Sequence, residues 1–245
     1  MLQIGMNLTT TVIIAVAILF VSTLIRSAIG FGDALIAMPL LAMAVGMQTA
    51  TPLVAFVAST IAIIVIAGNW RNVDMKSAWR LILLSLVGIP FGLVLLKVAP
   101  EQVVKIILGV LLILYGLYSL FAPRLPIIRN ESSAYIFGFV AGVLGGAYNT
   151  NGPPIVMYGL LRRWPPEHFR ATLQFYFLFT GLSILASHGI AGLWTPVVLW
   201  LYVYSIPAIV LAVYIGGKIN NRIPTALFSR VVYGLLVVIG VLFMI

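Results

Sequence analysis

The sequence lacks cysteine altogether and has few charged residues. Without cysteine the chain can form no disulfide, no thiolate nucleophile and no cysteine metal site. Only 8% of its 245 residues are charged, whereas an ordinary soluble domain has about 25%. Because 62% of the residues are hydrophobic, a soluble globule of this chain would expose a largely apolar surface to water. Lipid removes that difficulty, so the composition predicts an integral membrane protein.

Signatures of enzymes are also missing. The chain contains no H-E-x-x-H, G-x-S-x-G or P-loop pattern. Its five acidic residues and two histidines are scattered, which disfavours a hydrolytic metal site. We therefore predict no catalytic residues, no metal, no cofactor and no ATP-driven step within this chain.

The net charge of +9 has a different meaning in an apolar chain than in a soluble one. In a soluble protein it would suggest nucleic acid as a partner. Here the basic residues stand singly in short gaps between apolar runs, which is typical of membrane orientation. We therefore expect the lipid bilayer as a partner and no nucleic acid.

Ten apolar segments account for nearly the whole chain. A helix needs about 20 apolar residues to cross a bilayer. Three segments are shorter, at residues 34–47, 132–147 and 153–161. No basic residue precedes the first segment, so we interpret it as a mature helix and not as a cleavable signal. The full-length candidates are residues 8–29, 51–69, 77–98, 102–122, 170–188, 195–217 and 225–244.

The order of landmark residues indicates an internal duplication. Gly30 and Pro39 are nine residues apart, and so are Gly145 and Pro154. Many transporters are built from such repeats. We predict a first membrane repeat at residues 1–125 and a second at 126–245, with about five segments each. The other matched landmarks are Ala50-Thr51 with Ala171-Thr172, Gly68 with Gly189, Pro90 with Pro207, and Gly109 with Gly234.

The positions of lysine and arginine predict the orientation of the segments. If the N-terminus is outside and each segment reverses the chain, the outer gaps hold only Lys97 and Lys105. The positive-inside rule then places both termini outside the cytoplasmic membrane, and the odd number of segments inverts the second repeat. We thus predict an all-α polytopic membrane protein of two inverted-topology repeats. The predicted cytoplasmic gaps hold Arg71, Lys76, Arg80, Arg124, Arg129, Arg162, Arg163, Arg170, Lys218, Arg222 and Arg230.

Two glycine-rich turns interrupt the apolar segments, one in each predicted repeat. The short segments either span the membrane or dip in and turn back, and at the second turn we favour a re-entrant or broken hairpin. A helix break inside the membrane frees backbone N–H groups, which suit an anion. Alternatively, the glycines permit tight helix packing and the asparagines cap helix ends. The first turn contains Gly30, Phe31, Gly32 and Asp33, and the second contains Gly145, Gly146, Asn149, Thr150 and Asn151.

Further polar side chains are candidates for the same site. Arg26 either holds an anionic substrate or pairs with Asp33 near the cytoplasmic interface. Asp33 and His188 are candidates to carry a coupling proton, although His188, at the end of its segment, also fits an interfacial histidine. Gln174, one turn into its segment, is a candidate to face a cavity.

The motif Gly30–Leu41 resembles the first repeat motif of the TauE/SafE family of sulfite exporters and toluene sulfonate uptake permeases. The stretch Gly138–Pro154, followed by Arg170–Thr172, resembles the second repeat, and the likeness covers essentially the whole chain. The resemblance implies transport of sulfite, sulfonates or similar sulfur oxyanions. This sequence departs from the family's more glycine-rich form at Gly32–Ala34 and Tyr148–Asn151, both within the predicted site.

The residues and the resemblance together predict a secondary transporter of small sulfur-containing anions in the cytoplasmic membrane. We expect it to work by alternating access, with two inverted halves that rock around a central site. Its partner is then a small anionic substrate, and the oligomeric state stays open. Two alternatives remain: an anion channel on the same scaffold, and a membrane enzyme or non-transport membrane subunit.

Overall fold

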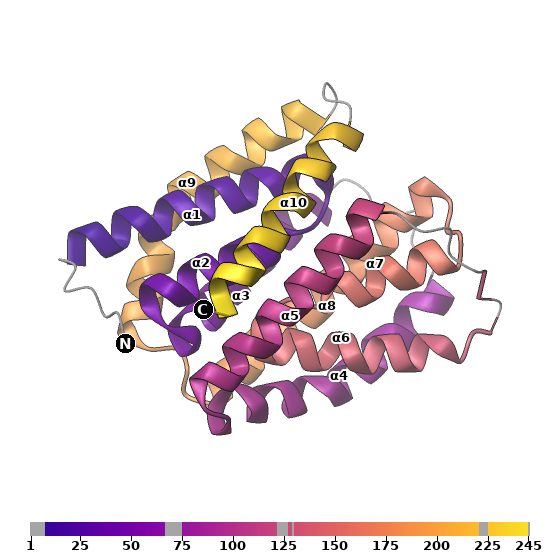
Figure 1. The fold of residues 1–245 in the computed structure, drawn as a ribbon, viewed down its shortest axis with the longest axis horizontal. Helices are drawn as coiled ribbons and strands as arrows, with labels where there is room; N and C mark the ends of the chain where they lie inside the picture. The colour runs from indigo at the N-terminus through magenta and orange to yellow at the C-terminus, as the bar shows by residue number, and fades with distance from the viewer. Residues whose placement is uncertain (1–7, 67–74, 122–126, 129, 221–224, 245) are drawn as a thin grey trace.

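The fold is helical throughout the residues that the computed structural model describes, which are 8–66, 75–121, 127–128, 130–220 and 225–244. All ten predicted segments are helices, and the largest differences at a helix start are at α3, which begins at Met47 and not at residue 51, and at α8, which begins at Pro166 and not at residue 170. In chain order (Figure 1) the helices are α1 (Leu8–Ile29), α2 (Asp33–Val45), α3 (Met47–Ile66), α4 (Met75–Val98), α5 (Glu101–Phe121), α6 (Ser133–Tyr148), α7 (Gly152–Leu161), α8 (Pro166–Ile190), α9 (Pro196–Asn220) and α10 (Thr225–Met244).

Among the described helices, six are long and apolar enough to cross a membrane: α1, α3, α4, α5, α8 and α9. Their outward faces expose large apolar side chains, such as Phe91, Trp200 and Tyr214. A surface of this kind is unfavourable in water and is expected where helices face lipid. The chain is therefore a polytopic membrane protein, as predicted.

Helices α6 and α7 form a hairpin whose turn is buried inside the protein. At its open end the Ile128 N–H donates to the Leu161 carbonyl (3.0 Å), and Arg162 Nη1 donates to the Ile128 carbonyl (3.1 Å). The two helices have 16 and 10 residues. They rise about 24 and 15 Å, less than the roughly 30 Å of a hydrocarbon core. The chain thus enters and leaves this hairpin at one end, which agrees with a broken hairpin.

Helices from the two predicted repeats pack against each other in matched pairs. Helix α1 packs along α9, and α6 packs along α4 (Figure 1). Replacing each helix with the helix five places away in chain order turns the first pair into the second. The same operation leaves the pairs α5–α10 and α3–α8 unchanged. This pattern is expected of a duplicated fold, while the inversion of the repeats and their boundary at residues 125 and 126 stay predictions.

The packing divides eight of the helices into two groups. The first group contains α1, α2, α3 and α9, and the second group contains α4, α6, α7 and α8. Each group therefore combines three helices of one predicted repeat with one helix of the other. The groups face each other mainly through α3 and α8, while α5 and α10 pair with each other. The halves of the chain are thus interleaved in space.

Glycines determine how closely the helices approach within a group. A Cβ on Gly92 of α4 would lie 2.0 Å from the Val143 carbonyl oxygen of α6, and one on Gly142 would lie 2.2 Å from the Ser85 carbonyl oxygen. The backbones of α4 and α6 are thus in direct contact, which only small residues permit. Between the groups, a Cβ on Gly181 of α8 would lie 3.5 Å from Ser59 Oγ, an ordinary van der Waals distance, so the backbones of α3 and α8 are not in direct contact there.

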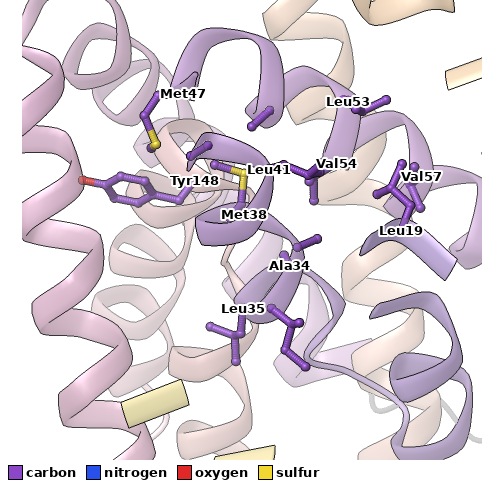
Figure 2. Packing of buried hydrophobic residues seen from close by; sticks show 14 of the residues in the cluster. Leu19, Ala34, Leu35, Met38, Leu41, Met47, Leu53, Val54, Val57 and Tyr148 are labelled. Carbon is purple, nitrogen blue, oxygen red and sulfur yellow. The ribbon is translucent and has the colours of Figure 1, made fainter. Parts of the chain in front are cut away.

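The short helix α2 lies within the largest hydrophobic cluster. Met38 and Leu41 of α2 are fully buried there, close to Met47 at the start of α3 (Figure 2). Tyr148, the last residue of α6, places its ring in the same cluster. Tyr148 directly precedes the second glycine-rich turn, and α2 directly follows the first. The cluster therefore holds the two turns next to each other.

Candidate functional site

The two glycine-rich turns meet at one cavity between the helix groups. The cavity has a volume of about 30 Å³. Both turns of the predicted site therefore share one space, and the roles of their residues in binding stay predictions. The first group contributes Arg26, Phe31, Gly32, Asp33, Ala34, Leu35 and Ala58 to its wall, and the second contributes Asn149, Thr150, Asn151, Gly152, Pro153, Phe177 and Gly181.

The first turn depends on two glycines with positive φ. Gly30 has a φ of 103° and Gly32 a φ of 99°, where a side chain would be strained. The Gly30 N–H still donates to the Arg26 carbonyl (2.6 Å) and ends α1. Gly32 then reverses the chain so that α2 begins at Asp33. The turn thus brings the end of α1 and the start of α2 to the same cavity wall.

The second turn is built differently. Asn149 adopts the left-handed conformation (φ 55°), and its N–H caps α6 by donating to the Gly145 carbonyl (2.8 Å). Helix α7 then starts with Gly152, Pro153 and Pro154. Proline has no N–H, so Pro153 and Pro154 lack two of the free backbone donors that a helix start normally offers. The donors on this side of the cavity are therefore the backbone N–H groups before Pro153 and the side chains of the turn.

Arg26 and Asp33 form a buried ion pair across the first turn. Arg26 Nη1 donates to Asp33 Oδ2 (2.8 Å), and both side chains are buried. The guanidinium also lies over the Phe177 ring, 5.4 Å from its centroid. The predicted pairing is thus present, but inside the protein and not at an interface. Burial of either charge alone would cost several kcal/mol, on the order of 3–5 when a partner is removed.

This ion pair leaves part of the guanidinium without a partner. Arg26 Nε and Nη2 are buried and have no hydrogen-bond acceptor among the described residues. These two nitrogens form one fork of the guanidinium, the geometry that matches two oxygens of an oxyanion. A buried donor left unpaired costs about 1–3 kcal/mol. A ligand that supplies acceptors to these two nitrogens would therefore be stabilised here.

The polar residues of the second turn divide into engaged and available groups. Asn151 Nδ2 donates to Thr180 Oγ1 (3.0 Å), so this asparagine has a structural contact on α8. Thr150 Oγ1 is buried and has no partner among the described residues. The Asn149 side chain is also buried at the cavity wall. Thr150 and Asn149 are thus the side chains of this turn that remain available to a ligand.

Five predicted site residues lie outside the cavity wall: Gly30, Gln174, Gly145, Gly146 and His188. Gln174 Nε2 donates to the Gly30 carbonyl (2.9 Å), so it supports the first turn from behind. Gly146 lies against α4, where a Cβ would come 2.2 Å from the Ile89 carbonyl oxygen. Gly145 lies against α8, where a Cβ would come 2.7 Å from the Ile184 side chain. These two glycines thus permit close helix packing, which was the alternative to a role in anion binding.

His188 is fully buried in the protein, in the last turn of α8, and its place at the membrane interface stays a prediction. Its Nε2 lies 3.1 Å from the Gly146 carbonyl oxygen, which accepts the hydrogen bond. The chain after α8 folds back, and Trp194 Nε1 donates to the Leu185 carbonyl (3.2 Å). Trp194 also packs on Gly189 and covers the end of the helix. His188 does not line the cavity, so its role as a proton carrier stays a prediction.

Sequence reasoning missed two residues of the cavity wall on α8. Phe177 and Gly181 line the cavity and follow Gln174 by three and seven residues. Residues at these spacings lie on one face of a helix. The spacing from Gln174 was therefore the signal that pointed to them. Among the described residues, no group of three histidine or acidic side chains could hold a metal ion.

Comparisons with known proteins cover nearly the whole chain. A family model described as "Sulfite exporter TauE/SafE" matches residues 14–243. A protein of Cupriavidus necator called "Probable sulfite/organosulfonate exporter TauE" is 22% identical over 240 residues, which cover 91% of this chain and 90% of that protein. No solved structure matches the chain. The matched region includes every residue of the cavity wall.

The ion pair predicts a matched result for single and double substitutions. Arg26→Gln leaves Asp33 buried without its cation and should lower the free energy of unfolding by about 3–5 kcal/mol. The double variant Arg26→Gln/Asp33→Asn removes both charges and should recover most of that loss. Thermal unfolding of the purified protein in detergent measures both. A single variant as stable as the parent would show that the pair does not hold the turn.

Proposed function

The chain belongs to the sulfite exporter TauE/SafE family, and on that premise we propose that it carries small sulfur oxyanions through the cavity between its glycine-rich turns. As a member of this family it is a membrane transporter and not an enzyme. The anion, the binding residues and the mode of transport are our proposal.

The observation that carries the proposal is the set of unpaired donors at the cavity wall. Arg26 Nε and Nη2 from the first turn and Thr150 Oγ1 from the second are all buried, with no partner among the described residues. A sulfur oxyanion offers only acceptors, and hydrogen bonds to ionised groups contribute about 1.5–3 kcal/mol each. One bound anion would satisfy donors from both turns at once. The Asn149 amide adds a neutral donor at the same wall.

The charges at the cavity also favour an anion of modest charge. Arg26 and Asp33 are the charged residues of its wall, and they neutralise each other through one hydrogen bond. A bound anion adds negative charge near the Asp33 carboxylate, so a proton on Asp33 would offset it and release Arg26 Nη1. We therefore keep Asp33 as the candidate for a coupling proton. His188 has no contact with the cavity wall and is the weaker candidate.

Alternating access fits the way in which the helix groups meet. The cavity lies between the first group and the second, and Ala58 of α3 and Gly181 of α8 both line it. Within the second group, backbone contact at Gly92 and Gly142 leaves no room for sliding. Between the groups, the backbones of α3 and α8 are not in direct contact at Ser59 and Gly181, which leaves room for the two helices to slide. We propose that the two groups, and not the two halves of the sequence, move around the bound anion.

The distribution of basic residues supports the proposed orientation in the cytoplasmic membrane. Arg80 at the start of α4 pairs with Glu131, and Arg162 after α7 lies 3.9 Å from the same carboxylate. These residues gather at the end proposed to face the cytoplasm. At the other end Lys97 donates to the Ala191 carbonyl (2.9 Å). Both termini are then outside, as the positive-inside rule predicts.

An anion channel on the same scaffold is the second candidate. It shares the cavity but requires no alternation between the groups. Counterflow distinguishes the two in proteoliposomes, because unlabelled anion inside accelerates entry of labelled anion only through a carrier. A conductance without counterflow would favour the channel.

The binding role of Thr150 predicts a change in transport without a loss of stability. Thr150→Val removes a hydroxyl that could bond a charged ligand, a loss of about 1.5–3 kcal/mol, or roughly 10–100-fold in KM for sulfite. The folded protein should be no less stable, because the hydroxyl has no partner among the described residues. Uptake of labelled sulfite into proteoliposomes and thermal unfolding measure the two effects.

A matched control is available on α1. Thr23 is also fully buried, its hydroxyl has no partner in the described part of the chain, and it does not line the cavity. Thr23→Val should leave the KM for sulfite unchanged. If Thr150→Val transports sulfite with the KM of the parent, the hydroxyl does not bind the anion and the proposed site is wrong.

Movement between the helix groups predicts a specific effect of cross-links. The chain has no cysteine, so an introduced pair of cysteines can form a disulfide only with each other. In Ser59→Cys/Gly181→Cys the Ser59 side chain already comes within 3.5 Å of the new Cβ, which suits a disulfide between α3 and α8. Oxidation should stop sulfite transport, and later reduction should restore it to the level that the double variant had before oxidation.

The control cross-link lies within the second group. Phe91 of α4 and Phe139 of α6 have ring centroids 5.6 Å apart, so a short thiol-reactive linker can join Phe91→Cys and Phe139→Cys. This cross-link should leave transport intact. Full transport by the oxidised α3–α8 pair, or loss of transport in the linked α4–α6 pair, would contradict the proposed moving groups.

A further inference from the structure

We infer that Phe31 and Phe177 limit the site to compact sulfur oxyanions of the size of sulfite and exclude sulfonates with a bulky organic group. This inference rests on the proposed function and specifies the substrate class of the same cavity. It concerns two aromatic side chains, one from each helix group: Phe31, which the sequence predicted as part of the substrate site, and Phe177, which it missed.

The size of the cavity sets the first limit. Its volume of about 30 Å³ is small beside the roughly 300–1,000 Å³ of an ordinary ligand pocket. Sulfite, a sulfur atom with three oxygens, is the smallest of the proposed substrates. An aryl or longer alkyl sulfonate adds a carbon substituent for which the cavity has no room.

The two aromatic rings converge on the first residue of α7. A Cβ placed on Gly152 would lie 3.6 Å from Phe177 Cζ and 4.0 Å from Phe31 Cδ2. Both rings line the cavity, and Gly152 is the residue between them. Even the smallest side chain at this position would contact both rings. The cavity is therefore closed by aromatic surface on the side of α7.

Contacts with neighbouring residues also fix the positions of the two rings. The Arg26 guanidinium lies over Phe177 at 5.4 Å from the ring centroid, and Phe177 is buried. Phe31 packs against the two largest hydrophobic clusters, one around α2 and one around α7 and α8. Neither ring can turn aside without losing these contacts. A bulky substituent would thus have to displace packed side chains, at a cost of about 1–3 kcal/mol or more.

The rest of the cavity wall limits the carbon substituent of a bound sulfonate. If the oxygens accept from Arg26 and Thr150, the substituent still has to fit among the other residues of the wall, which include Phe31, Phe177 and Pro153. A larger apolar cavity of about 610 Å³ exists between α5, α6 and α7, and Pro153 lines both spaces. Pro153 is buried and separates them, so the substituent cannot use that room while α7 keeps its first turn.

Competition during transport tests the inference. Uptake of labelled sulfite into proteoliposomes is measured against unlabelled sulfite and unlabelled benzenesulfonate. In the parent, benzenesulfonate should compete poorly. In Phe177→Ala and Phe31→Ala, the concentration of benzenesulfonate for half-inhibition should fall about 10–100-fold, the range expected when a pocket stops excluding a group, while the KM for sulfite changes less.

Controls separate the filter from general damage. Phe179→Ala alters an exposed aromatic residue on the same helix that does not line the cavity, so it should leave both values unchanged. Phe177→Leu keeps most of the packing and serves if Phe177→Ala does not fold. The same competition in Phe177→Leu should show a smaller shift in the same direction.

The outcomes also separate this inference from the proposed function. If the parent transports sulfite and benzenesulfonate competes equally well, the size limit is wrong and the proposed function stands. The size limit is also wrong if sulfite is transported and neither phenylalanine variant changes the competition. If the parent transports neither sulfite nor any sulfonate, the proposed function fails first.

Discussion

A guanidinium and a carboxylate inside an apolar protein are tolerated only when each is paired and hydrogen-bonded. Arg26, in the last turn of α1, and Asp33, the first residue of α2, meet this constraint with one hydrogen bond of 2.8 Å. The bond ties together the two arms of the first glycine-rich turn. It also uses only Nη1, so the fork formed by Nε and Nη2 stays available at the cavity. The position of the turn thus depends on this pair, and so does the anion binding that we propose for it.

The second turn complements the first without a charge of its own. Its backbone is short of donors because α7 begins with two prolines after Gly152. The Thr150 hydroxyl and the Asn149 amide take their place at the cavity wall. The hydrophobic cluster around α2 and Tyr148 keeps the two turns together (Figure 2). The cavity wall thus takes one contribution from each helix group, as the proposed alternating access requires.

Much of this fold could be predicted from the sequence, because lipid imposes simple rules on length and polarity. Apolar runs located all ten helices, and the spacing from Gly30 to Pro39 and from Gly145 to Pro154 pointed to the two turns that share the cavity. The pairing of α1 with α9 and of α4 with α6 was not predictable, because apolar faces toward lipid and toward protein look alike in sequence. The burial of His188 and the position of Phe177 at the cavity depend on how the helices pack, which is why the sequence predicted neither.

Selenite, a heavier analogue of sulfite, offers the most direct test of the central claim that an oxyanion binds between the two turns. The measurement is a structure of the protein with selenite, with the selenium located by its anomalous signal. The account predicts a peak in the cavity, within hydrogen-bond reach of the Arg26 fork and the Thr150 hydroxyl, and a weaker peak in Thr150→Val. A peak elsewhere in the protein, or an empty cavity in protein whose sulfite transport selenite inhibits, would contradict it.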